Sequence, residues 1–244
     1  MKNICLILQY VGTNYCGFQI QKNGITVQEV LENTIEECLN EKCKTYASGR
    51  TDAGVHALGQ VVNFFTSTTV QPEKIKVVLN LKLPKDIRVM DSFEVPMEFN
   101  SCKSAKSKTY IYKIFNGNIL SAFDQDRCLF CGYKLDLEKM NQACKLIEGE
   151  HDFSSFVASN ATTKTTVRTI YKAEFVKEGD YLTFVITGNG FLYNMVRILV
   201  GTLIEIGRNK IDLKTLQELL KGGQRNKAGK TVKSDGLYLK EVNY

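Results

Sequence analysis

The chain has 244 residues, of which 43% are hydrophobic and 24% are charged, and its net charge at pH 7 is +6. This composition is ordinary for a globular protein that buries a core, and it argues against a disordered or fibrous chain. No apolar run approaches the ~20 residues that span a bilayer, and residues 1–8 lack the long apolar core of a signal peptide, so we expect a cytoplasmic protein without a membrane anchor.

The cysteine content raises the question of metal or redox chemistry. There are eight cysteines, and Cys128 and Cys131 form a C-x-x-C pair. A structural zinc site needs four ligands, and the sequence has no second C-x-x-C and only two histidines. We therefore predict no metal site, and we expect most cysteines to act as small buried apolar residues.

The first half of the chain reads as strand, helix, two strands, helix and strand. Residues 3–10 alternate as a strand, and Thr26 and Glu29 form a capping box that starts a helix. The remaining elements are expected at 44–48 and 58–66 (strands), from Pro72 to about 81 (helix) and at 87–95 (strand).

The second half repeats this order. Its elements are expected at 109–115, 167–176, 181–187 and 237–242 (strands), and at 137–147, 191–206 and from a cap at Asp212 to Gly222 (helices). The sequence thus predicts an α+β fold of two similar, ferredoxin-like halves, 1–100 and 101–244, with a polar seam near 96–106. Their strands would form a continuous, mostly antiparallel sheet flanked by helices, with a central basic cleft.

Two segments are basic and contain no acidic residue. Residues 221–233 carry five basic side chains, and the lysines between 103 and 113 alternate with Tyr110 and Tyr112. Such runs are often only solvated faces. Aromatic residues among cations can also stack on bases while the lysines hold phosphates, so nucleic-acid binding stays open at this point.

Residues 47–65, A-S-G-R-T-D-A-G-V-H-A-L-G-Q-V-V-N-F-F, hold an acid close to a cation. Asp52 follows Arg50 by two residues, and Gly49 and Gly54 permit a tight, exposed loop at the rim of a cleft. Loop chemistry alone also allows a plain alternative, in which Asp52 accepts a hydrogen bond from its own backbone and Arg50 forms a surface ion pair.

The string G-R-T-D-A-G-V-H-A, followed by G-Q-V, closely resembles the signature of the TruA family of tRNA pseudouridine synthases. The resemblance covers nearly the whole chain. Further similar segments are Q-Y-V-G-T-N-Y-C-G-F-Q (9–19), N-L-K-L-P (80–84), Y-I-Y (110–112), H-D-F (151–153), F-L-Y-N-M-V-R-I-L-V-G (191–201) and G-L-Y-L (236–239).

The resemblance implies an isomerase that converts uridine to pseudouridine in the anticodon arm of tRNA, at positions 38, 39 and 40. The base is detached at N1, turned and rejoined to the ribose through C5. This needs no redox change and no net hydrolysis, so the resemblance implies neither cofactor nor metal. It further implies tRNA as the partner and a homodimer in which one tRNA contacts both subunits.

The resemblance makes Asp52 the catalytic carboxylate. An aspartate with an ordinary pKa of about 3.9 is ionised at neutral pH, but whether it attacks C1′, attacks the base or removes a proton stays open. Arg197 would pair with Asp52 and aim it, or, as an alternative, extend to solvent. Tyr110 would pack against the uracil, although a tyrosine in a strand is often a core residue. Arg50 would help to extrude the nucleotide.

His56 would touch RNA or only brace the loop by hydrogen bonding. Further possible RNA contacts are Lys106, Lys108, Arg225 and Lys227. The chain departs from the family pattern at Val11, Phe18 and Cys102, where the family has Asp, Trp and Arg, and at residues 232–235. A relative with a shifted target uridine, even in another RNA, is therefore an alternative.

Two other functions compete with an RNA-modifying isomerase. One is a non-catalytic RNA-binding or RNA-folding protein, and the other is a small-molecule enzyme that uses the Arg50–Asp52 loop. The presence of the carboxylate and both arginines argues for catalysis. The basic runs would be of no use to a small-molecule enzyme.

Overall fold

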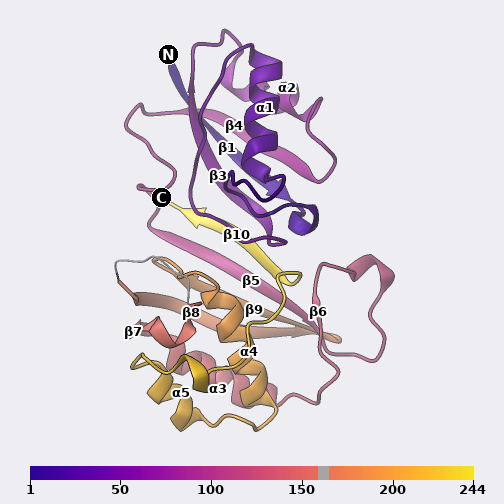
Figure 1. The fold of residues 1–244 in the computed structure, drawn as a ribbon, viewed down its shortest axis with the longest axis vertical. Coiled ribbons are helices and arrows are strands. Elements are labelled where there is room, and N and C mark those ends of the chain that lie inside the picture. Colours follow the sequence, from indigo (N-terminus) through magenta and orange to yellow (C-terminus); the bar gives the residue numbers. More distant parts are fainter. Residues whose placement is uncertain (159–164) are drawn as a thin grey trace. The chain divides into compact units, whose positions relative to one another are not determined.

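A computed structural model describes residues 1–158 and 165–244 (Figure 1). The strands are β1 (Lys2–Tyr10), β2 (Tyr46–Ala47), β3 (His56–Thr66), β4 (Ile87–Val95), β5 (Ser107–Phe115), β6 (Leu129–Phe130), β7 (Gly149–Asp152), β8 (Val167–Glu178), β9 (Tyr181–Gly188) and β10 (Leu237–Asn243). The helices are α1 (Val27–Leu39), α2 (Pro72–Asn80), α3 (Leu137–Ile147), α4 (Met195–Gly207) and α5 (Leu213–Leu219), with short 3₁₀ turns η1 (Gly12–Asn14), η2 (Ala122–Asp124), η3 (Phe153–Phe156) and η4 (Arg225–Lys227). The predicted α+β class, with mostly antiparallel strands flanked by helices, is confirmed.

The chain divides into two compact units. Unit 1 comprises Met1–Lys106 and Tyr238–Tyr244, and unit 2 comprises Ser107–Leu237. The sequence placed the last strand in the C-terminal half, 101–244, whereas most of β10 groups with unit 1. The reason is a parallel pairing of β10 with β3, in which Tyr238 lies opposite His56.

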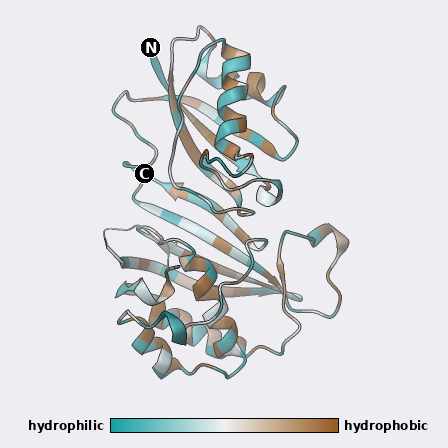
Figure 2. Ribbon diagram, viewed as in Figure 1, coloured by the Kyte–Doolittle hydropathy of each residue, from teal (hydrophilic) through white to brown (hydrophobic). Residues whose placement is uncertain are grey.

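In unit 1, β1 lies between β4 and β3 and runs antiparallel to both. Strands β2 and β10 also pair with β3, β2 opposite Asn63 and Val62, and β10 opposite His56 and Ala57. Helix α1 begins as predicted, because the hydroxyl of Thr26 accepts a hydrogen bond from the N–H of Glu29 (3.3 Å). Its buried residues include Leu31 and Ile35, spaced by about one turn, so the helix is hydrophobic on one face only (Figure 2).

Two fully buried asparagines attach the polar segment at 96–106 to the sheet of unit 1. The Asn3 side chain donates to the carbonyls of Pro96 (2.9 Å) and Phe99 (3.0 Å). Asn63 donates to Asn3 (2.9 Å) and accepts from the N–H of Ser101 (2.9 Å). The segment is therefore a fixed part of unit 1 rather than a loose linker.

Unit 2 contains the strand order β5-β9-β8-β7, with antiparallel neighbours, and β6 pairs with β5 in parallel. Strands β5, β9 and β8 follow one another in space as β1, β3 and β2 do in unit 1. This shared order agrees with the repeated order of elements in the two halves of the sequence, which suggests an internal duplication.

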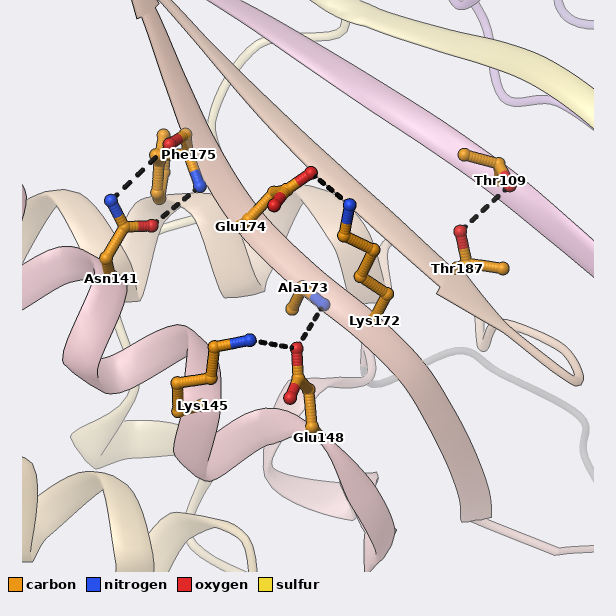
Figure 3. Close-up of polar contacts among 9 residues, drawn as sticks. All are labelled: Thr109, Asn141, Lys145, Glu148, Lys172, Ala173, Glu174, Phe175 and Thr187. Atoms are coloured by element: carbon orange, nitrogen blue, oxygen red, sulfur yellow. Dashed lines mark hydrogen bonds and ion pairs between the residues drawn. The ribbon is translucent and has the colours of Figure 1, made fainter.

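Helix α3 protects an edge of β8 with its side chains (Figure 3). Asn141 accepts from the N–H of Phe175 (2.8 Å) and donates to its carbonyl (3.4 Å), while Glu148 accepts from the N–H of Ala173 (3.0 Å). In unit 1, α2 contacts β4 in the same way. The side chain of Asn80 accepts a hydrogen bond from the N–H of Val89 (2.9 Å) and donates one to its carbonyl (2.8 Å). Each amide satisfies an edge residue that could otherwise pair with another chain.

The start of α4 differs from the prediction. The sequence predicts a helix from residue 191, but α4 begins at Met195 because Asn194 adopts a left-handed conformation with φ of 60°. Most of α4 is buried. Among the helices of residues 1–158 and 165–244, none has the combination of length and hydropathy needed to cross a bilayer.

Candidate active site

The loop that carries Asp52 connects β2 and β3 within unit 1. It presents its residues alternately, since Arg50 is exposed, Thr51 is buried and Asp52 is half-buried. A turn follows directly, closed by a hydrogen bond from the N–H of Val55 to the carbonyl of Asp52 (3.1 Å). Gly54 occupies this turn with φ of +77°, a conformation that favours glycine, as the sequence predicted.

The segment 9–19 packs against this loop through backbone contacts. A Cβ atom added to Gly12 would lie 2.0 Å from the carbonyl oxygen of Val55. One added to Gly17, which has φ of +87°, would lie 2.6 Å from the carbonyl oxygen of Thr51. That same carbonyl accepts a hydrogen bond from the N–H of Phe18 (3.0 Å). The two glycines thus allow two sequence motifs to meet without intervening side chains.

His56 joins these two motifs. Its Nδ1 accepts a hydrogen bond from the N–H of Gly12 (3.0 Å), so that ring nitrogen carries no proton. The ring stacks on Tyr238, with centroids 4.6 Å apart and planes at 28°. Only 2% of His56 is exposed. This position favours a bracing role over direct RNA contact.

In unit 2, Tyr110 lies in β5 opposite Ile186 of β9. It is 8% exposed, and the ring of Phe191 meets it edge-on at 5.1 Å. The residue is therefore largely covered in the free protein, and its proposed use as a platform for a base depends on the resemblance.

Arg197 lies in the first turn of α4 and is held by two hydrogen bonds. Its Nε donates to the carbonyl of Val232 (2.8 Å) and its Nη1 to the side-chain oxygen of Asn194 (2.7 Å). A cation at a helix N-terminus is opposed by the helix dipole. These two hydrogen bonds hold the guanidinium of Arg197 in a fixed conformation at the start of the helix.

The carbonyl that binds Arg197 belongs to residues 228–233, here called the strap. The strap lies directly on α4 (Figure 1), since a Cβ added to Gly201 would meet the carbonyl oxygen of Lys230 at 1.9 Å. The N–H of Gly229 also donates to the hydroxyl of Thr202 (2.9 Å). Gly201 is therefore required for the strap to approach the helix.

Two serines directly after the H-D-F segment (151–153) anchor the chain that leads into the strap. Asp152 caps η3 by accepting from the N–H of Ser154 (2.9 Å). The hydroxyls of Ser154 and Ser155 then accept from the N–H groups of Gly223 (2.8 Å) and Gln224 (3.1 Å). The start of the basic segment 221–233 is thereby fixed to the body of unit 2.

The remaining candidate RNA contacts differ in their surroundings. Lys106 and Lys227 are exposed, and Lys108 is half-buried. Arg225 is also half-buried, and it donates to the carbonyl of Gly229 (3.0 Å) and to the hydroxyl of Thr231 (3.2 Å). Arg225 therefore shapes the strap, a role that the basic run did not suggest.

The C-x-x-C pair brackets β6. Cys128 and Cys131 are both buried, and burial raises the pKa of Cys128 to about 11. Within the described part of the chain, no three His, Cys, Asp or Glu side chains gather in a way that could hold a metal ion.

Known proteins resemble the chain over its full length. A family model described as tRNA pseudouridine synthase matches residues 6–103 and 143–244. The chain belongs to this family. A protein named tRNA pseudouridine synthase A from Clostridium acetobutylicum is 46% identical over 244 residues, with both chains fully covered. One of the same name from Acetivibrio thermocellus is 44% identical, again with full coverage of both.

The likeness to solved structures is much weaker. A Cbf5-Nop10-Gar1 complex matches 83% of this chain and 45% of the other chain, with 17% identity and a TM-score of 0.35. A match at this level carries no argument about function.

Two departures from the family pattern have simple structural accounts. Phe18 is 2% exposed and fills a core position where the family has Trp. Residues 232–235 differ from the family, but Arg197 binds the carbonyl oxygen of Val232, which every residue type supplies. Cys102 is exposed, and nothing in the structure explains its replacement of the family's arginine.

Sequence reasoning missed four residues that fix the site from within. Gly12 and Gly17 lie in the segment 9–19, and Gly201 lies in 191–201. Each has to be glycine because another part of the backbone approaches it closely, which only the folded structure reveals. Gln60, in the G-Q-V that follows the signature, is fully buried and bonds to the loop. A glutamine between apolar residues of a strand is the signal that could have revealed it.

Proposed function

We propose that the protein isomerises uridine to pseudouridine in the anticodon arm of tRNA, at positions 38, 39 and 40, with Asp52 as the catalytic carboxylate. Membership of the tRNA pseudouridine synthase family supports the reaction. The observation that carries the role of Asp52 is its position, half-buried beside exposed Arg50 in a loop fixed by Gly12, Gly17 and His56.

The proposed reaction exchanges one glycosidic bond for another. The N1–C1′ bond breaks, the base turns, and a C5–C1′ bond forms, while C5 loses a proton and N1 gains one. A carboxylate can act here as a nucleophile towards C1′ or the base, or as the group that accepts the proton. A rigid loop favours each of these roles, because the carboxylate does not have to be ordered when the substrate arrives.

Access to the base requires that the nucleotide leave the stack, which is unfavourable by a few kcal/mol. Arg50 would help to extrude the nucleotide or would occupy the space that it vacates, and its exposure two residues from Asp52 supports this role. Tyr110, supported edge-on by Phe191, would pack against the extruded uracil.

Arg197 would keep the catalytic carboxylate ionised and aimed. Two hydrogen bonds, to the carbonyl oxygen of Val232 and the side-chain oxygen of Asn194, hold its guanidinium in one orientation. A charge held in the first turn of a helix gains from a nearby anion. This supports Arg197 as the cation that supports Asp52.

For the RNA we propose a basic cleft that includes Lys106, Lys108, Arg225 and Lys227, with His56 bracing the loop from within. We further propose a cytoplasmic homodimer that binds one tRNA across both subunits, since a symmetric dimer is the commonest oligomer. A mass measurement in solution, with and without tRNA, tests the stoichiometry.

Mapping of pseudouridine across total RNA tests the function directly. Cells that lack the protein should lose pseudouridine at positions 38, 39 and 40 of tRNA, and the wild-type gene should restore it. Asp52→Asn should not restore it, whereas Asp126→Asn should. Asp126 is a matched control because it is exposed and has φ of 58°, a conformation that asparagine tolerates.

Unchanged tRNA in the deleted strain would contradict the proposed target. Loss at other uridines would indicate a different RNA site. Restoration by Asp52→Asn would favour a non-catalytic role for the protein, and activity on free uridine that is insensitive to salt would favour a small-molecule enzyme.

A further inference from the structure

A buried glutamine holds the backbone before Arg50. Gln60 lies in β3 with none of its surface exposed. Its side-chain oxygen accepts a hydrogen bond from the hydroxyl of Ser48 (2.6 Å), and its side-chain nitrogen donates to the carbonyl of Gly49 (2.8 Å). One amide therefore fixes the two residues that precede Arg50.

A buried tyrosine holds the residue after Arg50. Tyr10, at the end of β1, is 3% exposed, and its hydroxyl shares a hydrogen bond of 2.7 Å with the hydroxyl of Thr51. Burial raises the pKa of Tyr10, so the phenol stays protonated at neutral pH.

The loop therefore has inward side chains that are held by buried hydrogen bonds and outward side chains that are accessible to solvent. Ser48 and Thr51 point into the network, whereas Arg50 is exposed and Asp52 is half-buried. We propose that Tyr10 and Gln60 are positioning residues for Arg50 and Asp52 in the reaction. This proposal rests on the proposed function, and neither side chain needs to touch the RNA.

The alternative is that the network only stabilises the fold. Buried polar groups are normally hydrogen-bonded, and loss of one partner destabilises a protein by about 1–3 kcal/mol whatever its function. The two roles predict different kinetics. A positioning role lowers kcat because the loop is misplaced for chemistry, and it leaves the KM for tRNA nearly unchanged, since the outward cations remain.

Tyr10→Phe and Thr51→Val each remove one side of the hydroxyl contact without changing the volume much. We expect each to lower kcat about tenfold or more, because a misplacement of about 1 Å can reduce the rate 100-fold. KM should stay within about twofold. The double variant should be no slower than either single variant, because all three lose one shared contact. Thr51→Ser, which keeps the hydroxyl, should retain wild-type kcat.

Gln60→Met tests the other side of the loop, and it should also lower kcat with little change in KM. If that variant does not fold, Ser48→Ala removes only the bond to the amide oxygen and should give a smaller reduction of kcat. Tyr181→Phe is the matched control, because its hydroxyl bonds to Asp124 in unit 2 (2.6 Å), and it should leave kcat unchanged.

The proposal is overturned if Tyr10→Phe and Thr51→Val lower the melting temperature but keep wild-type kcat, or if KM rises while kcat does not change. It is also overturned if the losses in the double variant add up, because the two hydroxyls would then act independently. Failure of the proposed function looks different, since the wild-type protein itself would form no pseudouridine in tRNA.

Discussion

The Asp52 loop of unit 1 and the Arg197 helix of unit 2 fix their charged side chains by opposite means. The position of Asp52 is set by the backbone of its loop. Gly12 and Gly17 pack closely against this backbone, and buried hydrogen bonds hold it on both sides. Arg197 lies on a regular helix, and the guanidinium itself is held by the carbonyl of Val232 and the amide of Asn194.

This difference explains why the sequence predicts the Asp52 loop more clearly than the surroundings of Arg197. A loop held by backbone contacts tolerates few residue types, so its constraints appear as one contiguous string around Asp52. A strap that contributes a carbonyl leaves its side chains free to vary, as Val232 and Lys233 illustrate. Substitutions that displace the backbone in unit 1 and those that change a side chain in unit 2 should therefore have different effects on turnover.

Gly12→Ala should have the largest effect. The new Cβ would collide with the carbonyl oxygen of Val55, so the loop must shift, and we expect kcat to fall by about 100-fold or more. Steady-state turnover of tRNA measures this. Gly132→Ala is the matched control, because its Cβ would make only an ordinary contact, 3.5 Å from Phe130. Turnover of Gly12→Ala within threefold of the control would refute the backbone account.

Arg197→Lys should have the next largest effect. Lysine keeps the charge but cannot make the same two directed hydrogen bonds, so we expect kcat to fall about tenfold. Val232→Ala should retain full activity, because the strap contributes its carbonyl and not its side chain. The same turnover assay compares the two variants. A larger loss in Val232→Ala than in Arg197→Lys would contradict this description of unit 2.

The two asparagines that cover sheet edges should matter for stability and not for turnover. Asn80→Ala and Asn141→Ala each leave backbone groups of one edge residue without their partner. We expect each to lower the free energy of unfolding by about 1–3 kcal/mol. Denaturant unfolding measures the loss, and hydrogen exchange should localise it to Val89 or Phe175. Unchanged protection there would show that these bonds are not formed in solution.

The smallest effect concerns thiol reactivity. Burial raises the pKa of Cys128 from 9.0 to about 11, so the protonated thiol stabilises the fold below pH 9 and this contribution is lost as the pH rises through 11. Alkylation of the folded protein near pH 8 should therefore modify exposed Cys102 well before Cys128. Mass spectrometry of the digested protein gives the order. Equal rates at the two cysteines would show that Cys128 is accessible.

The sequence predicted the α+β class, the capping box at Thr26 and most strands, because these depend on local periodicity and turn chemistry. It misplaced the start of α4, because the hydrophobic pattern of 191–206 does not reveal the left-handed conformation of Asn194 directly before Met195. The parallel pairing of β10 with β3 joins parts of the chain that are far apart in sequence, so no local pattern indicates it.

The motif was sufficient to name the candidate site residues, but it did not reveal which buried residues hold them in position. Gln60 and Tyr10 act through contacts with residues 11 and 41 positions away, and no local pattern specifies such distances. The close contact of the strap with Gly201 likewise cannot be predicted from the sequence, because it joins residues that are far apart along the chain.

The most direct test of the account is single-turnover pseudouridine formation by purified Asp52→Asn on an anticodon-arm tRNA substrate. The variant should fold like the wild type and bind tRNA with similar affinity, because the loop backbone is held by groups other than this carboxylate. It should form no pseudouridine. Formation at a rate close to that of the wild type would show that the reaction does not depend on Asp52.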